Sequence, residues 1–314
     1  MKTRVATRDE IERALVGLDL LPAIEAGFVA YSRGEAVVPP VGELLLPGGE
    51  VHIKYGYIKG DEFYVIKAAS GFYENPKLGL ASSNGLMLLF RATTGEPVAV
   101  LLDEGKLTDI RTAVAGAICA KYLAPEEVRK IGIVGTGTQA RLQLSYLKGV
   151  TPCREVLVWG RRDEALTQYR ADMAREGFSI EVTTDASRVL RECDLVVTCT
   201  PATTPLLSAA DLHPGLHITA VGSDTPEKQE LDAEILARAD LVVADSRAQC
   251  QERGEIHHAL SAGLLREEEV VELGEVIAGD ALGRTGASQI TVADLTGVAV
   301  QDIKIAVAVY QALA

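Results

Sequence analysis

The chain has 314 residues, of which 47% are hydrophobic and 24% are charged, and its formal net charge is −13. This composition predicts a soluble globular protein that is long enough for two domains. An acidic surface argues against a nucleic-acid partner and against an anionic membrane, although a local basic pocket needs only a few cations. No segment approaches the roughly 18 consecutive apolar residues of a membrane span, and the N-terminal residues turn polar too early for a signal peptide.

The first hundred residues predict an α+β domain. Residues 7–10 (TRDE) form a capping box that opens a first helix, and a second, amphipathic helix is expected over residues 21–32. Alternation of apolar and polar residues then predicts antiparallel strands, because no segment with helical periodicity separates them. The four predicted strands cover residues 51–58, 63–70, 85–90 and 97–103.

The rest of the chain alternates strands with helices. A helix of small and apolar residues is expected over residues 112–123, and a last helix over about 298–313. Five short apolar strands are predicted between them, over residues 131–135, 156–160, 195–200, 218–222 and 241–245. This pattern is typical of a parallel, doubly wound sheet. The fold class is therefore α/β, with a Rossmann domain and an α+β domain on which the last helix is expected to pack.

A glycine loop follows the first of these apolar strands and opens a helix. It consists of Gly135, Thr136, Gly137, Thr138, Gln139 and Ala140. Gly135 permits a tight turn, Gly137 lets the backbone approach a pyrophosphate, and Ala140 is small enough for close packing of the helix on the strand. The helix N-terminus offers free N–H groups to phosphates. We therefore expect a dinucleotide here, rather than a glycine turn without a ligand.

The end of the second strand of this domain bears on the choice of dinucleotide. An NAD site normally places an acidic residue there, to bind the 2′-hydroxyl of the ribose. This chain has Gly160, Arg161 and Arg162 instead. A glycine makes room for a 2′-phosphate and the guanidinium groups can pair with it, which favours NADP(H) over NAD(H). A solvated arginine pair is the alternative.

The cysteines and histidines give no sign of a metal site. The five cysteines are scattered without a CxxC pair, and we expect buried free thiols in a reducing cytoplasm. The histidines at positions 213, 217, 257 and 258 have no ligand partner at metal-binding spacing, so we interpret them as structural or surface residues.

Three motifs together resemble the ornithine cyclodeaminase/mu-crystallin family over nearly the whole chain. They are LTDIRTA at 107–113, IGIVGTGTQA at 131–140 and AVGSDTPEKQEL at 220–231. The resemblance implies a substrate-binding and dimerisation domain made of residues 1–115 with 300–314, and a Rossmann domain made of residues 116–299. It also implies a homodimer joined through the substrate domains, and hydride transfer at the α-carbon of an amino acid.

The resemblance assigns roles to three charged residues. Arg111 would bind the α-carboxylate of the substrate, for which a planar guanidinium is suited, and Lys67 would contact the same carboxylate and help to polarise the imine. Asp224 would exchange a proton with the substrate nitrogen. Each has an alternative: Arg111 in a surface salt bridge with Asp103 or Asp109, Lys67 at an outward position of an edge strand, and Asp224 as a capping group.

The same resemblance suggests further cofactor contacts. One group borders the nicotinamide side of the site and comprises Val221, Gly222, Ser223 and Lys228. A second, weaker group comprises Thr112, Thr200, Pro201 and Thr296.

The sequence departs from the family at two positions that bear on the substrate. An arginine that the family often has after the second helix is replaced by Val41. Thirteen residues before Lys67, where ornithine-specific members have a carboxylate, this chain has Lys54, with His52 on the same strand face. Lys54 either replaces the missing arginine at the α-carboxylate or binds a second acidic group of the substrate. The alternative is that His52 and Lys54 lie on the polar face of a half-exposed strand.

These features predict a cytoplasmic, homodimeric NAD(P)-dependent oxidoreductase that interconverts an α-imino acid, such as a cyclic ketimine, with an L-amino acid. The first alternative is a cyclodeaminase, a lyase that releases ammonia and uses NAD⁺ catalytically. A second alternative is a non-catalytic NADP-binding protein. The presence of Lys67, Arg111 and Asp224 together argues against the last, because a binding protein needs no group for proton transfer.

Overall fold

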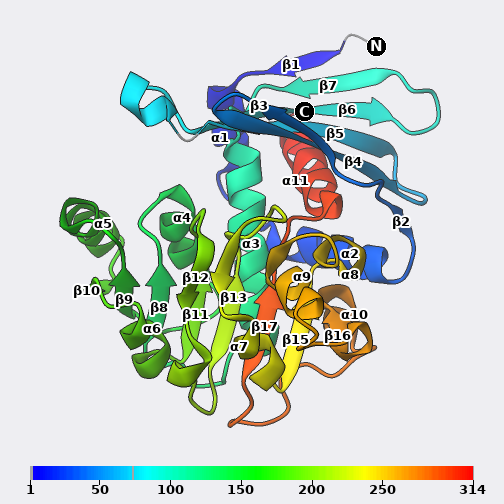
Figure 1. The fold of residues 1–314 in the computed structure, drawn as a ribbon. Helices are drawn as coiled ribbons and strands as arrows, with labels where there is room; N and C mark the ends of the chain where they lie inside the picture. The colour runs from blue at the N-terminus through cyan, green and yellow to red at the C-terminus, as the bar shows by residue number, and fades with distance from the viewer. Residues whose placement is uncertain (1–2, 73, 314) are drawn as a thin grey trace. The chain divides into compact units, whose positions relative to one another are not determined.

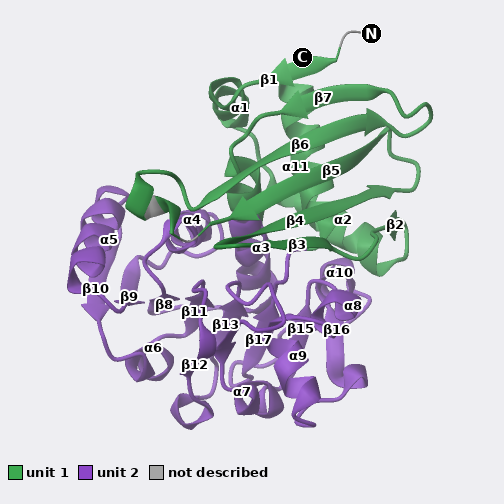
Figure 2. Cartoon of the chain, turned by 45° about the horizontal axis from the view of Figure 1, so that its top comes forward, with its two compact units in different colours: residues 1–111, 298–314 green, residues 112–297 purple. Residues whose placement is uncertain are grey.

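Two units, each with its own sheet and core, make up the chain. The computed structural model describes residues 3–72 and 74–313. One unit comprises residues 1–111 with 298–314, and the other comprises residues 112–297 (Figure 2). The boundaries expected from sequence, after residues 115 and 299, lie close to these. No helix in the described part of the chain is long and apolar enough to cross a membrane.

The first unit contains a seven-stranded mixed sheet. The strands follow the order β1-β7-β6-β5-β4-β2, and β3 pairs with β4. Their bounds are Arg4–Ala6 (β1), Ala36–Val37 (β2), Gly42–Leu46 (β3), Gly49–Ile58 (β4), Phe63–Gly71 (β5), Ser83–Arg91 (β6) and Pro97–Leu101 (β7). The four antiparallel strands predicted from alternation are confirmed as β4 to β7. Strands β1 and β2 were not predicted because two or three residues show no period, and β3 was not predicted because its sequence GELLL does not alternate.

The helices of this unit begin and end where local chemistry favours it. In α1 (Arg8–Leu15) the Glu10 carboxylate accepts a hydrogen bond from the N–H of Thr7 at 2.9 Å, as the capping box predicted. The predicted helix over residues 21–32 is confirmed as α2 (Leu21–Ser32). The last helix, α11 (Ala299–Ala312), packs against α2, β4 and β5, so the chain does return to this unit (Figure 1). A short 3₁₀ helix covers Asn75–Leu78.

Strand β4 turns its polar residues inward. His52 and Lys54 are only 8% and 5% exposed, whereas Ile53, Tyr55 and Tyr57 are 40%, 39% and 40% exposed. The alternative that His52 and Lys54 lie on a half-exposed polar face is therefore wrong. Alternation shows that a strand has two faces, but which face is buried depends on the register with its neighbours.

The second unit contains an eight-stranded parallel sheet in the order β10-β9-β8-β11-β13-β17-β15-β16, and a separate parallel pair β12-β14. The bounds are Ile131–Val134 (β8), Glu155–Trp159 (β9), Ser179–Thr183 (β10), Leu195–Thr198 (β11), Thr203–Leu207 (β12), His217–Ala220 (β13), Gln229–Leu231 (β14), Leu241–Ala244 (β15), Val270–Glu272 (β16) and Thr291–Asp294 (β17). All five predicted strands are confirmed, as β8, β9, β11, β13 and β15. The others escaped prediction because they are short or contain polar residues.

Helices connect these strands. They are α4 (Thr138–Leu147), α5 (Asp163–Arg175), α6 (Ser187–Glu192), α7 (Ala233–Arg238), α8 (Arg247–Cys250), α9 (Gly254–Ser261) and α10 (Leu273–Ala278), with 3₁₀ turns at Ala209–Asp211 and Glu267–Glu269. Helix α3 (Lys106–Leu123) precedes β8 and continues from the first unit into the second. Helix α3 begins six residues before its predicted start, so the whole LTDIRT motif is helical. The α/β class with a Rossmann sheet is confirmed.

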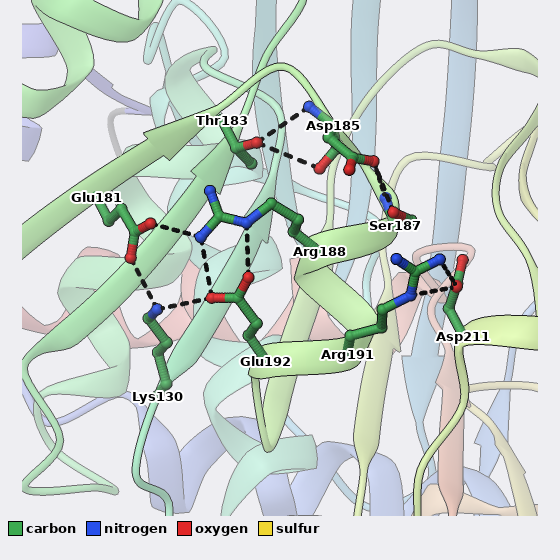
Figure 3. A network of polar contacts seen from close by, with 9 residues as sticks. All are labelled: Lys130, Glu181, Thr183, Asp185, Ser187, Arg188, Arg191, Glu192 and Asp211. Atoms are coloured by element: carbon green, nitrogen blue, oxygen red, sulfur yellow. Dashed lines mark hydrogen bonds and ion pairs between the residues drawn. The ribbon is translucent and has the colours of Figure 1, made fainter.

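A network of ion pairs ties β10 to α6 and to the residue before β8 (Figure 3). Lys130 contacts Glu181 and Glu192 at 2.8 and 3.1 Å, and Arg188 contacts Glu192 at 2.6 Å. These four side chains are between 24% and 46% exposed. We call them the Arg188 network.

Candidate active site

The glycine loop has the geometry of a phosphate-binding turn. Gly135, directly after β8, has a φ of +122°, which a residue with a side chain rarely adopts. Gly137 is the N-cap of α4, and a Cβ placed on it would have no atom within 4 Å, so its backbone is open to a ligand. Ala140 is fully buried in the first turn of α4, as close helix–strand packing requires.

A cleft of about 240 Å³ lies at this loop. It is lined by Gly135, Thr136 and Gly137 of the loop, by the end of β9 with Gly160 and Arg161, and by Thr200 and Pro201 after β11. The structure therefore brings together three segments that the sequence assigned to a cofactor. Their position at the carboxyl ends of parallel strands, beside the point where the strand order reverses between β8 and β11, is where such sheets bind ligands.

The two arginines after Gly160 differ in position. Arg161 lines the cleft and is exposed, whereas Arg162 is the N-cap residue of α5. A Cβ on Gly160 would lie 2.8 Å from Thr136 and 3.0 Å from Leu166, so a larger residue would not fit without movement. Both arginines are exposed, and of the two Arg161 lines the cleft whereas Arg162 does not.

These features fit a dinucleotide. The cleft combines a glycine that cannot carry a side chain, an open helix N-terminus for the pyrophosphate, and an exposed guanidinium near the second strand. Thr138 and Gln139 form the first turn of α4, where N–H groups lack helical partners.

The segment after β13 carries the predicted proton-transfer residue. Asp224 pairs with Lys228 at 2.7 Å, and its side chain is 38% exposed. Val221 and Ser223 on the same segment are buried. The Ser223 hydroxyl donates a hydrogen bond to Glu255 at 2.5 Å, so this side chain holds the segment in place.

Thr112 and Thr296 are engaged in packing contacts of the second unit. The carbonyl oxygen of Thr112 accepts a hydrogen bond from Gln143 at 3.0 Å. Thr296 is 1% exposed, and its hydroxyl contacts Asp245 at 2.9 Å. Neither lines the cleft at the glycine loop.

In the first unit, Lys67 and Arg111 meet at one carboxylate. Lys67 on β5 and Arg111 on α3 each lie 3.0 Å from an oxygen of Asp302 on α11. The guanidinium of Arg111 also donates a hydrogen bond to Gln301 at 3.1 Å. All of these side chains are buried, and β5 lies inside the sheet, so the alternatives of a surface salt bridge for Arg111 and an edge-strand position for Lys67 are wrong.

Burial and charge act on this cluster in opposite directions. Burial, only partly offset by Asp302, lowers the pKa of Lys67 to about 8. Burial alone would raise the pKa of Asp302, but the charges of Lys67, Arg111 and Lys54 outweigh it and lower that pKa. Asp302 is therefore ionised, and Lys67 changes its charge within a unit or so of neutral pH.

Lys54 is a third buried cation, and it lies on the same face of the first sheet as Lys67. It stands directly opposite Lys67 in the register of β4 and β5. His52, two residues earlier, lies 3.0 Å from Glu43 of β3. A face with three buried cations is suited to one or more carboxylates. The neighbouring Asp103 accepts a hydrogen bond from the N–H of Leu107 at 2.7 Å.

Sequence reasoning missed the acidic residues that organise both regions. Asp302 and Gln301 interrupt the apolar run of the last helix, and a carboxylate in such a run was the available signal. Glu230 and Glu255 are both at most 1% exposed. Glu230 lies within the motif at 220–231, but its residue type alone did not distinguish it from a surface carboxylate, and Glu255 lies outside the three motifs. No group of three metal-ligating side chains occurs among residues 3–72 and 74–313.

The chain matches a known family over its whole length. The model of the ornithine cyclodeaminase/mu-crystallin family matches residues 1–314. A protein of Sinorhizobium fredii, described as an uncharacterized cyclodeaminase, is 44% identical over 316 residues, which cover 98% of this chain and 95% of that protein.

Solved structures of similar proteins contain nicotinamide cofactors. An archaeal alanine dehydrogenase dimer with bound NAD has a TM-score of 0.91 and 35% identity, covering 99% of this chain and 96% of the other. An iminosuccinate reductase of Paracoccus denitrificans with NAD⁺ has a TM-score of 0.89 and 34% identity, covering 99% of this chain and 96% of the other. A Δ¹-pyrroline-2-carboxylate reductase of Thermococcus litoralis with NADH and L-proline has a TM-score of 0.93 and 26% identity, covering 99% of this chain and 97% of the other.

Proposed function

The chain belongs to the ornithine cyclodeaminase/mu-crystallin family, and from this premise we propose that it is an NAD(P)-dependent oxidoreductase that interconverts an α-imino acid and an L-amino acid. The observation that carries the proposal is that Lys67 and Arg111 converge on one buried carboxylate in a chain that also has a dinucleotide cleft. The similar proteins of known structure act on alanine, iminosuccinate or pyrroline-2-carboxylate, which share this step.

Each residue has a defined role in the proposed reaction. Arg111 and Lys67 bind the α-carboxylate, and Asp302 holds these two cations in place between substrates. Asp224, oriented by its ion pair with Lys228, takes a proton from the substrate amine or returns one to the imine nitrogen. The nicotinamide cofactor, when bound, accepts or supplies the hydride. Fixing the carboxylate at two points orients the α-carbon, which can account for much of the rate.

The first test follows the absorbance of NADPH or NADH with imino acids formed from 2-oxo acids and ammonia, and with preformed cyclic ketimines. Loss of absorbance with one substrate is expected. Release of ammonia from ornithine on catalytic NAD⁺, with no net absorbance change, would instead establish the lyase.

The role of Asp224 can be tested separately. Asp224→Asn is expected to lower kcat by roughly 10²–10⁴-fold, because proton transfer by a positioned group contributes about that much. Glu227→Gln is the matched control, since it removes an exposed carboxylate from the same segment. Near wild-type activity of Asp224→Asn would refute the assignment and favour a binding protein.

We further propose that the cofactor is NADP(H), on the support of Gly160 and the exposed Arg161 in the cleft. Arg161→Ser is expected to weaken NADPH binding more than NADH binding, and Arg162→Ser to have the smaller effect. An unchanged ratio of the two dissociation constants in Arg161→Ser would favour NAD(H).

The substrate side chain depends on Lys54. If Lys54 helps to hold the α-carboxylate, Lys54→Met is expected to raise KM for all imino acids alike. If it binds a second acidic group, the variant raises KM for imino dicarboxylates alone. A panel that contains both classes separates these two roles.

A homodimer is also proposed, in the cytoplasm, where reducing conditions keep the five free cysteines unpaired. The outer face of the first sheet has an apolar groove lined by Val37, Tyr55, Tyr57, Tyr64 and Ile66. Exposed apolar surface of this kind marks interfaces. Tyr55→Glu is expected to give monomers in light scattering, whereas Leu264→Glu, an exposed leucine of the second unit, is not.

A further inference from the structure

Glu230 joins the ends of two neighbouring strands of the parallel sheet. It lies on β14 and is completely buried. Its Oε1 accepts hydrogen bonds from the N–H and the hydroxyl of Thr200, at 2.6 and 2.8 Å. Its Oε2 accepts from the hydroxyl of Thr198 and the N–H of Gly222, at 2.8 and 2.9 Å. Thr198 ends β11 and Gly222 follows β13, so one carboxyl group fastens both strand ends.

The two strand ends approach so closely that position 222 must be glycine. A Cβ there would lie 2.2 Å from the carbonyl oxygen of Thr200 and 2.4 Å from Oε2 of Glu230. The carboxyl group of Glu230 therefore fills the space between the strands and supplies the acceptor that both N–H groups need.

A second buried carboxyl group holds the same segment from the other side. Glu255 of α9 accepts hydrogen bonds from the N–H groups of Glu230 and Leu231, at 2.8 and 3.1 Å, as well as from Ser223. The segment that carries Asp224 is thus fixed at both ends.

The partners of Glu230 named above are uncharged N–H and hydroxyl groups. Burial, together with the neighbouring charge of Glu255, raises the pKa of Glu230 to about 8. Burial likewise raises the pKa of Glu255 to about 7. Glu230 can therefore gain or lose a proton near neutral pH without leaving its hydrogen bonds, because a hydroxyl partner can accept as well as donate.

The position of Glu230 relates it to one half of the cofactor. Thr200 lines the dinucleotide cleft. In a doubly wound sheet the dinucleotide crosses the switch point, here between β8 and β11, with one half over β9 and the other over the strands beyond β11. Since Gly160 and Arg161 lie at the end of β9, the nicotinamide half belongs over the ends of β11 and β13.

We propose that Glu230 is the positioning residue of the nicotinamide half, and that its carboxyl group sets the relative affinity for oxidised and reduced cofactor. The inference rests on the proposed function. The oxidised ring carries a positive charge that the reduced ring lacks, and an anion at low local dielectric stabilises only the former. Binding of oxidised cofactor therefore releases a proton from Glu230, whereas binding of reduced cofactor does not.

Several other titratable groups lie around Glu230. Glu255 of α9 and Cys199 after β11 interact with it electrostatically. The ion pair of Asp224 and Lys228 lies on the segment that precedes it in the chain. The test must separate Glu230 from them, so it compares variants as well as redox states.

The experiment measures dissociation constants of oxidised and reduced dinucleotide by calorimetry from pH 6.5 to 8.5, in buffers of different ionisation heat. The wild-type ratio of oxidised to reduced constants is expected to fall as pH rises, by up to ~10-fold per pH unit, the limit for one proton. Any titration of the cofactor's own phosphates cancels in this ratio. Proton release is expected with the oxidised form only.

Glu230→Gln is expected to make the ratio independent of pH. Asp294→Asn is the matched control, because Asp294 is an equally buried carboxyl group that accepts from the N–H of Ile256 instead, at 2.8 Å. This control is expected to keep the pH dependence. If Glu230→Gln does not fold, Thr198→Val tests the inference instead. This variant removes one hydrogen-bond donor to the carboxylate of Glu230, so the midpoint of the pH dependence is expected to move to higher pH.

A pH-independent ratio in the wild type, or an unchanged pH dependence in folded Glu230→Gln, overturns the inference alone. An unmoved midpoint in Thr198→Val does the same. Failure of the wild type to bind any dinucleotide overturns the proposed function and this inference with it.

Discussion

The cluster around Asp302 and the Arg188 network contain the same kinds of groups at nearly the same distances. Lys67 and Arg111 lie 3.0 Å from Asp302, and Lys130 lies 2.8 and 3.1 Å from its two glutamates. They differ in access to water: the side chains of Lys67 and Asp302 are 2% and 1% exposed, whereas those of the network are at least 24% exposed.

Exposure to water determines how much such ion pairs contribute to stability and to ligand binding. An exposed ion pair contributes little to folding stability, because water solvates both charges when the pair breaks. Buried charges depend on each other, because the loss of one leaves the others with neither a partner nor water. Buried cations also keep their full attraction for a carboxylate that enters from solution. This contrast ranks the effects of substitution.

Asp302→Asn is expected to have the largest effect. It removes the carboxylate that pairs with both Lys67 and Arg111, which costs about 3–5 kcal/mol of unfolding free energy for a broken buried pair. Urea denaturation measures this. Glu181→Gln, which weakens the exposed pairs with Lys130 and Arg188 (Figure 3), is the control and should change little. Equal effects of the two substitutions would contradict the comparison.

Lys67→Met is expected to act mainly on substrate binding. The variant removes one of two cations from the α-carboxylate, and hydrogen bonds to charged groups contribute about 1.5–3 kcal/mol, so KM should rise by roughly 10–150-fold. The dissociation constant of the cofactor should stay unchanged. A fall in kcat with KM unchanged would instead place Lys67 at the reacting nitrogen.

The cluster also predicts opposite pH trends for activity and stability. The kcat/KM should fall as pH rises through about 8, where Lys67 loses its charge. Stability should rise between pH 8 and 10.5, because the unfolded chain, with an ordinary lysine pKa of 10.5, then binds more protons than the folded one. Both trends should disappear in Lys67→Met; their persistence there would assign the titration to another group.

The sequence predicted much of this fold and part of this site. The glycine loop was recognisable because its residue types follow from the backbone conformation, as Gly135 shows. Arg111 and Asp224 were singled out as candidates through motifs, and Lys67 through the family resemblance and its position on a predicted strand. The sequence did not predict which face of β4 is buried, because strand register depends on contacts distant in sequence. Asp302 and Glu230 escaped for the same reason: each is defined by partners that only the fold brings near.

Substitution in the Arg188 network is expected to have the smallest effect on stability. Arg188→Ala removes contacts with Glu181 and Glu192, but water replaces them, so the loss of unfolding free energy should stay below about 1 kcal/mol. Salt at 1 M should reduce even that, because the screening length falls to about 3 Å. Kinetic constants for imino acids should not change. A loss as large as that of Asp302→Asn would show that exposure does not separate the two clusters.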